Sequence, residues 1–298
     1  MQAANTMGYR PSRIAQALQG KSTQLIGVFM PDTDDFFFQT VVKHLRHTLE
    51  ESDYELIVFV SPPGQIPQKW QKLLQWDLDG VFVFDYMFYV KGLWEALTQH
   101  SGAIPPVVGL FSNTSELDDY ISLDFGAAME TLLAHLKGLG RKRFGYLALA
   151  DSFQYGEQRY ALFSEFVRRH GLEQCDIKLA RCQESLMEVA KCGTEEWLKC
   201  GEPVPDALFC QNDELAIGAY AALREAGYTV PGQVALAGCD DLPYARFLDT
   251  PLTSVCLPVQ EVCRQGWNLL QQRIAAPEKP PAQVVVEASL TLRASCAV

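Results

Sequence analysis

Short apolar segments alternate with longer amphipathic ones along this chain, and that alternation limits the possible folds more than any other feature. In the first part of the chain the predicted strands cover residues 24–30, 54–60, 78–84 and 105–111, and the predicted helices cover 37–52, 67–76 and 91–100. Strands that are apolar on both faces and separated by helices are typical of a parallel sheet covered on both sides. We therefore predict a doubly wound α/β unit.

The same alternation starts again near residue 124. The predicted helices are 126–140, 156–170, 184–199 and 213–227, and the predicted strands are 143–149, 176–181, 206–211 and 233–239. A strand at 252–258, a helix at 259–275 and a strand at 283–293 remain, and their order predicts that the chain crosses back to the first unit and then returns to the second. The predicted lobes are 23–136 with 254–276, and 137–253 with 277–298, with a cleft between two facing strand edges.

Charge is distributed unevenly along the chain. Residues 1–24 contain Arg10, Arg13 and Lys21 and no acid, which leaves 22 of the 25 basic residues against 36 acidic ones in the remainder. DNA phosphates would repel so acidic a body, so any contact with nucleic acid is predicted to come through the N-terminal segment.

The nine cysteines are scattered, with no C-x-x-C pair, and indicate reduced thiols in a cytoplasmic protein. The N-terminus lacks the apolar region of a signal peptide, and no segment is long and apolar enough to span a membrane. Neither a catalytic motif nor a cofactor-binding motif is present, so we expect a protein that is not an enzyme and has no cofactor. His44 and His47 could pair on one helix face, but without a third ligand we expect no metal site.

Polar and aromatic residues gather where the predicted strands end. The candidates are Asp35, Phe36, Phe37, Asp85, Asn113, Asn212 and Asp240. Carboxylates and amides that bind hydroxyl groups, beside aromatic faces that stack on C–H surfaces, are typical of carbohydrate recognition. Each candidate also has a structural alternative. Asn212 or Asp213 would cap the helix that begins there, Asp240 and Asp241 would form a turn, and Arg159 would be a surface ion-pair partner.

Several segments in this order resemble the LacI/GalR-type (lactose-repressor) family of transcriptional regulators. The N-terminal stretch "MGYRPSRIAQALQGKSTQLIGVFMPD" is similar to that family's junction of hinge and core, and "DFGAAMETLLAHLKGLGRKRFGYL" and "PDALFCQNDELAIGAYAALREAGYTVPGQVALAGCDDLP" are similar to two core segments. The similarity extends over essentially the whole chain.

This resemblance implies a core of two lobes like that of periplasmic binding proteins, a small effector such as a sugar or sugar derivative, a homodimer, and operator DNA bound through an N-terminal headpiece. It implies effector-binding roles for Asp124, Arg159, Asn212 and Asp240. Residues 1–22 would hold the tail of the headpiece and a DNA-contacting hinge, which comprises Arg10, Pro11, Ser12, Arg13, Ala17 and Leu18. With most of the headpiece outside this sequence, we expect dimerisation and effector binding but no operator recognition by this chain alone.

Four positions depart from the family pattern. Asp35 adds a charge after the first strand, Ala128 and Leu162 replace glycines, and Cys239 replaces a phenylalanine. These changes affect effector identity more than fold. The composition favours a neutral polyhydroxylated effector over a nucleobase, and a sugar acid or phosphate remains an alternative if Arg159 has no competing carboxylate. The alternative function is a free-standing sugar-binding protein of a transport system, which would need a signal peptide and no hinge.

Overall fold

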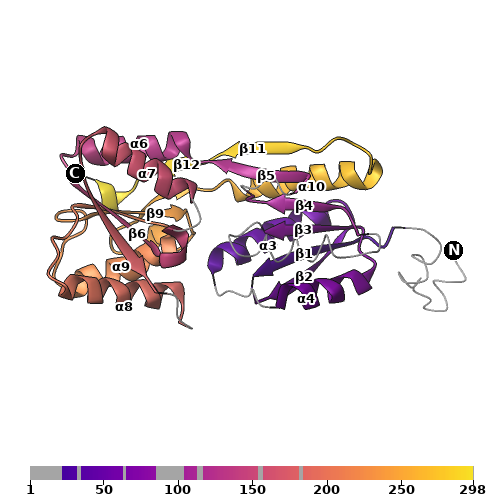
Figure 1. The fold of residues 1–298 in the computed structure, drawn as a ribbon, viewed down its shortest axis with the longest axis horizontal. Helices are drawn as coiled ribbons and strands as arrows, with labels where there is room; N and C mark the ends of the chain where they lie inside the picture. The colour runs from indigo at the N-terminus through magenta and orange to yellow at the C-terminus, as the bar shows by residue number, and fades with distance from the viewer. Residues whose placement is uncertain are drawn as a thin grey trace, which may run out of the picture. The chain divides into compact units, whose positions relative to one another are not determined.

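The computed structural model describes residues 22–31, 35–62, 65–84, 104–112, 117–153, 157–180 and 184–297 (Figure 1). The chain divides into two compact units, of which the first comprises 1–32, 41–122 and 259–285 and the second 33–40, 123–258 and 286–298. The predicted helix at 91–100, the hinge residues 10–18, Asp85 and Asn113 lie outside the described residues.

A sheet of six strands forms the centre of the first unit. In spatial order these are β11 (Gln283–Glu287), β5 (Asp119–Asp124), β4 (Val107–Leu110), β3 (Gly80–Phe84), β1 (Leu25–Pro31) and β2 (Glu55–Ser61). Neighbours from β5 to β2 pair in parallel, with Val28 of β1 opposite Val58 on one side and Phe82 on the other. The apolar run of β1 is buried along nearly its whole length, as a central parallel strand requires.

Helices α3 (Phe36–Glu50), α4 (Ile66–Leu73) and α10 (Val259–Ala275) supply the side chains that cover this sheet. Alternate strand residues face opposite sides. Phe29 contacts Trp70 of α4 edge-to-face at 5.7 Å between ring centroids. On α10, a Cβ added at Gly266 would lie 2.5 Å from Leu110 and 3.4 Å from Phe82, so the glycine allows that helix to approach the strands closely.

The second unit also has a six-stranded sheet. Its spatial order is β12 (Ser289–Thr291), β10 (Thr253–Cys256), β9 (Ala235–Asp240), β8 (Ala207–Cys210), β6 (Arg143–Leu149) and β7 (Glu173–Leu179). The neighbouring strands from β10 to β7 pair in parallel, and β12 is antiparallel to β10.

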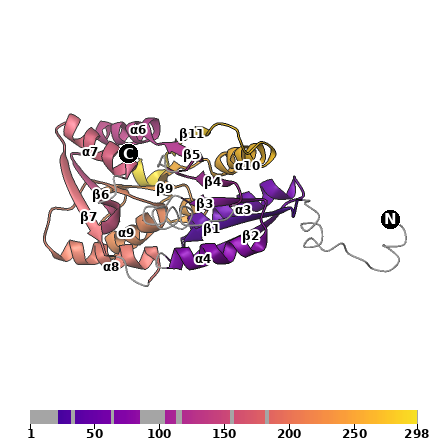
Figure 2. The ribbon, with the colours of Figure 1, turned by 45° about the vertical axis from the view of Figure 1, so that its right-hand side comes forward.

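Two pairs of helices cover the second sheet. Helices α6 (Gly126–Gly138) and α7 (Gln158–Arg169) lie side by side, as do α8 (Leu186–Lys199) and α9 (Asp213–Glu225), in both Figure 1 and Figure 2. The α8–α9 pair shares a core with Leu147, Leu208 and Leu236 of the strands. Phe144, Phe163 and Phe166 are buried together where α7 contacts β6.

The chain does cross back to the first unit and return, but the unit limits differ from the predicted lobes. Residues 123–136 and 254–258 belong to the second unit, because α6 packs against α7 and β10 pairs with β9. Residues 277–285 belong to the first, because β11 is the neighbour of β5. Strand β5 was not predicted, and the single strand predicted at 283–293 is two strands in different sheets. Among the described residues, no helix is long and apolar enough to span a membrane.

Candidate functional site

The predicted site residues of the second unit meet at the carboxyl ends of three neighbouring strands. Gln211 and Asn212 follow β8, Asp240 ends β9, and Arg159 lies in the first turn of α7, the helix that comes after β6. Ligands of open parallel sheets bind outside the carboxyl ends of the strands. The second sheet therefore carries a candidate site at this edge.

Arg159 is held by an ion pair that is mostly buried. Its Nε donates to Glu157, and the two side chains are 15% and 11% exposed. Its Nη1 donates to the Gln211 carbonyl at 2.7 Å, and its guanidinium lies 5.3 Å from the Phe125 ring centroid. The other oxygen of Glu157 accepts the hydroxyl of buried Tyr146. Arg159 is therefore an ion-pair partner, as the structural alternative expected, but its pair is largely shielded from solvent.

Cys239 brings one departure from the family pattern into the site. Its thiol is buried near the Arg159 guanidinium, and burial raises the pKa of Cys239. Burial by itself lowers the pKa of Arg159, but the nearby charge of Glu157 opposes this, and the pKa is raised. Glu157 and Gln211 accept hydrogen bonds from two of the five N–H donors of Arg159, so further donors of the guanidinium remain.

Asn212 caps α9, as predicted from the sequence. It adopts extended backbone, and its side-chain oxygen accepts the Leu215 N–H at 2.9 Å. This bond uses the amide oxygen, and the amide nitrogen of Asn212 has no hydrogen-bond partner among the residues that the structure describes, so it can donate to a ligand hydroxyl. Capping and ligand binding are compatible at this residue.

Carboxyl groups with raised pKa values gather around Asp240. Burial and then the neighbouring acids Asp35 and Asp213 raise the pKa of Asp240, and the structure gives its carboxyl no hydrogen-bond partner among the described residues. Burial, followed by the charge of Asp35, raises the pKa of Glu214 to about 8. With a pKa of about 8, the Glu214 carboxyl is protonated near pH 7, so it can donate as well as accept hydrogen bonds.

The start of α3 supplies aromatic groups to the same unit. Glu214 accepts the Phe36 N–H at 3.1 Å, and Asp35 accepts the Phe37 N–H at 2.8 Å. The Phe36 ring is 42% exposed and meets Tyr244 edge-to-face at 5.5 Å. An exposed aromatic ring beside carboxyl groups is a surface on which the C–H face of a sugar can stack.

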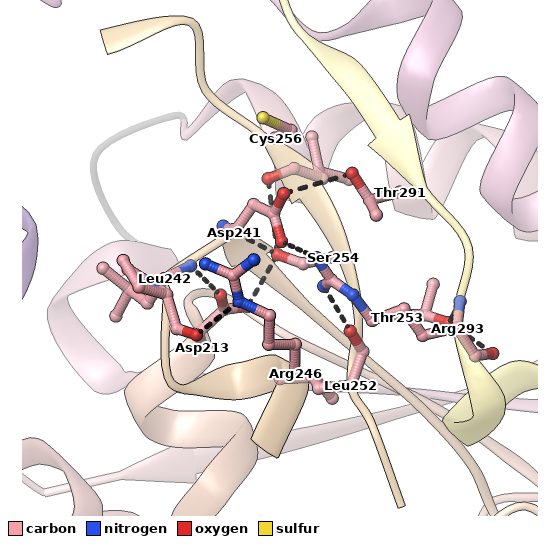
Figure 3. Close-up of polar contacts among 12 residues, drawn as sticks. Asp213, Asp241, Leu242, Arg246, Leu252, Thr253, Ser254, Cys256, Thr291 and Arg293 are labelled. Carbon is pink, nitrogen blue, oxygen red and sulfur yellow. Dashed lines mark hydrogen bonds and ion pairs between the residues drawn. The ribbon is translucent and has the colours of Figure 1, made fainter. Parts of the chain in front are cut away.

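Two further acids near β9 bind within the protein (Figure 3). Asp213 accepts the Leu242 N–H and the Ser254 hydroxyl, each at 2.7 Å. Asp241 forms an ion pair with Arg293 at 2.6 Å, and its N–H donates to Ser254 at 3.0 Å. These bonds join α9, β9, β10 and the chain after β12, and they fix the backbone that carries Asp240, whose φ is +108°.

The remaining candidates divide into two groups. Asp124 is exposed, and its carboxylate accepts the Gly126 N–H at 2.7 Å, where α6 begins. Asp85 and Asn113 lie outside the described residues, within which no cluster of three metal-ligating side chains occurs. The sequence did not predict a site role for Glu157, Gln211, Glu214 or Tyr244. Only the opposite charges of Glu157 and Arg159 in "YGEQRY" could have indicated one of them, because two such residues so close in sequence can form an ion pair.

Comparison with known proteins places the chain in a family. The sequence profile of the periplasmic binding protein-like domain matches residues 133–296. This span is more than half of the chain, so the chain belongs to that family.

Relatives and solved structures agree with this assignment. The HTH-type transcriptional repressor PurR of Haemophilus influenzae is 27% identical over 285 residues, which cover 92% of this chain and 81% of the relative. The lac repressor dimer bound to operator and the anti-inducer ONPF superposes with a TM-score of 0.82 at 20% identity, covering 100% of this chain and 88% of that one. A LacI family regulator from Enterococcus faecium with bound ribose gives 0.77 at 21% identity, covering 91% and 98%. The predicted α/β fold and the LacI/GalR-type resemblance are confirmed.

Proposed function

We propose that this chain is the effector-binding core of a sugar-responsive transcriptional regulator, acting as a repressor. The observation that carries the proposal is the group of Arg159, Asn212 and Asp240 at the carboxyl ends of the second sheet, in a chain of this family. The family's named members support the regulatory part, because PurR is a transcriptional repressor and the Enterococcus faecium regulator carries ribose.

The proposed mechanism is a population shift. A sugar that binds one conformation of the protein more tightly than another would shift the population toward it and so bias the contacts of a homodimer with operator DNA. DNA binding is assigned to the basic N-terminal segment, since the remainder of the chain is acidic. The protein is proposed to act in the cytoplasm, to be no enzyme and to need no cofactor.

A thermal-shift screen against sugars, sugar acids and nucleobases tests effector binding. A ligand at 100 times its dissociation constant should stabilise the protein by about 2.7 kcal/mol. Arg159→Lys keeps the charge but loses the planar fork, and Asp240→Asn tolerates the positive φ. Both variants should lose most of the gain, whereas Asp249→Asn, at a side chain 76% exposed, should keep it. Equal stabilisation of all four proteins would contradict this assignment of the site.

A mobility-shift titration of the natural full-length protein tests the regulatory part. Binding to the DNA upstream of its own gene should weaken steeply between 50 and 200 mM salt, about a thousandfold or more for six or more phosphate contacts. The sugar found in the screen should change the affinity. Sugar binding without any such DNA binding would support the alternative, a sugar-binding protein of a transport system.

A further inference from the structure

We propose that Glu157 determines the class of effector: by neutralising Arg159 it makes this site select a neutral polyhydroxylated ligand and reject sugar acids and sugar phosphates. The inference rests on the proposed function, because it concerns the sugar that the same residues would bind. It resolves the alternative that the sequence left open, which depended on a competing carboxylate at Arg159.

Glu157 cancels the charge of Arg159. Arg159 and Glu157 are in direct contact and are 15% and 11% exposed, so little solvent separates or screens them. A buried guanidinium paired with a carboxylate presents a dipole to a ligand instead of a full positive charge. An anionic ligand arriving at Arg159 would compete with Glu157 for the same cation.

The ionisable groups near Arg159 include Glu157, Cys239, Tyr146 and Asp240, and each of them is negative when it ionises and otherwise neutral. Any of them that ionised would add negative charge to the site. A carboxylate or phosphate would therefore meet like charges without a second cation from this set, which disfavours binding.

Neutral hydroxyl groups of a ligand still find hydrogen-bond partners at this site. Glu157 and Gln211 accept from two of the five N–H donors of Arg159, so the guanidinium retains further donors for a ligand hydroxyl. The Asn212 amide nitrogen and the Asp240 carboxyl add a donor and an acceptor. Sugar hydroxyls both donate and accept, so they match this mixed set better than an anion, which only accepts.

Tyr146 holds the Glu157 side chain in place. One oxygen faces Arg159 and the other accepts the hydroxyl of Tyr146, whose side chain is fully buried among Phe153, Tyr160 and Phe163. Tyr146 thus prevents Glu157 from rotating away when a ligand approaches. Glutamine at 157 can keep both contacts, because its carbonyl accepts from Arg159 and its amide donates to the Tyr146 oxygen.

The test compares neutral and anionic sugars in matched pairs. Glucose with glucuronate, galactose with galacturonate, and ribose with ribose 5-phosphate are titrated by thermal shift and calorimetry against wild type and Glu157→Gln. Glu173→Gln is the matched control. It removes the same charge from a side chain that is 70% exposed, at the first residue of β7 and hence at the opposite edge of the sheet.

Wild type and Glu173→Gln should bind the neutral member of at least one pair, and their dissociation constant for the anionic member of that pair should be at least ~10-fold higher. Glu157→Gln should shift that ratio toward the anion by about tenfold or more, because the charge of Arg159 is no longer cancelled. Thermal melts without ligand check that Glu157→Gln folds. If it does not, the wild-type ratios alone decide.

Three results would overturn the inference. Wild type that binds an anionic member as tightly as its neutral partner excludes the proposed selectivity, while leaving sugar binding intact. An unchanged ratio in folded Glu157→Gln shows that Glu157 does not set it, and again sugar binding stands. If no sugar of any pair stabilises any of the proteins, the proposed function itself fails, and the inference fails with it.

Discussion

At the residue scale, three neighbouring acids differ in what they bind. The Asp213 carboxyl accepts the Leu242 N–H and the Ser254 hydroxyl, and the Asp241 carboxylate pairs with the Arg293 side chain (Figure 3). The Asp240 carboxyl has no such partner among the described residues. The two structural acids make the position of the third precise. A site held by rigid neighbours loses less entropy on binding, which favours affinity.

The buried Asp213 should make stability depend on pH. Burial raises its pKa from the usual 3.8 to about 7, so the folded state holds a proton that the unfolded state releases. Its stabilising contribution is complete below about pH 4 and falls as the pH rises toward 7, by at most about 1.4 kcal/mol per pH unit. Relative to wild type, Asp213→Asn should therefore gain stability between pH 4.5 and 7.5.

The measurement for Asp213 is the difference in Tm between variant and wild type across that pH range. Asparagine can still accept the Leu242 N–H, so the backbone contact is retained. Asp249→Asn, at an exposed position, should show a difference that changes much less with pH. A Tm difference for Asp213→Asn that stays constant with pH would show that this carboxyl is ionised in the folded protein.

The sequence predicted some of these residues and could not predict others, for a physical reason. The Asn212 cap depends on local backbone, so a polar residue before an amphipathic helix was enough to predict it. The burial of the Arg159–Glu157 pair depends on Tyr146 in the middle of β6 and on Gln211 at the end of β8. Residues alone suggested a surface pair, because the desolvation that makes this pair important arises only when the sheet has formed.

At the element scale, α8 and α9 illustrate what close packing demands of one position. A Cβ added at Gly218 of α9 would lie 2.1 Å from the Met187 carbonyl oxygen and 2.7 Å from the Ala190 Cβ of α8. No rotation of a flexible side chain relieves a contact with backbone. Glycine is therefore required here for the two helices to approach, despite its lower helix propensity.

Gly218→Ala should accordingly destabilise the second unit. Overpacking between two helices typically lowers the free energy of unfolding by about 1–3 kcal/mol. The higher helix propensity of alanine raises it by roughly 0.5–1 kcal/mol, which offsets only part of that loss. Gly138→Ala in α6 is the matched control, because nothing lies within 4 Å of its added Cβ and stability should stay equal or rise. Urea unfolding of both variants measures the effect. Equal stability of the two variants would mean that α8 and α9 can separate without cost.

Strand β5 was not predicted because its apolar character is weak. It contains the polar residues Asp119, Ser122 and Asp124 beside only three large apolar residues, so its sequence does not look like a buried strand. Asp119 is nevertheless 3% exposed, because Arg273 of α10 binds it with Nε at 2.7 Å and Nη2 at 2.9 Å. Residues 154 positions apart thus make this strand possible, and local sequence carries no sign of that pairing.

At the scale of the whole molecule, the chain completes neither unit until its last 40 residues. Helix α10 and β11 return to the first unit, and β12 with residues up to 297 joins the second, where Ser295 accepts the Thr253 N–H at 2.7 Å. The sequence predicted this return from the surplus elements after residue 252. It did not predict which sheet each of these strands joins. Polar and apolar residues alternate without a break through β11 and β12, so the local pattern does not show where one strand ends and the next begins.

This topology predicts that a chain ending at residue 258 will not fold. Such a chain lacks α10, whose buried side chains are Val259, Val262, Cys263, Trp267, Leu269 and Leu270. Their burial is worth roughly 10 kcal/mol, as much as the whole stability of many domains. It also lacks β12 and Ser295, so both units should lose their cooperative transition. If the units were instead simple tandem domains, the first would be complete by residue 136 and would melt normally in this fragment.

Circular dichroism melts and size-exclusion chromatography of the fragment 1–258 beside the whole chain decide between these alternatives. The fragment should be aggregated or should melt without a cooperative transition, while the whole chain melts cooperatively. Supplying residues 259–298 as a separate peptide should restore part of the signal, because the missing elements add at sheet edges and across strand faces. A cooperative melt of the fragment within a few degrees of the whole chain would mean that α10 and β11 only cover an already stable unit.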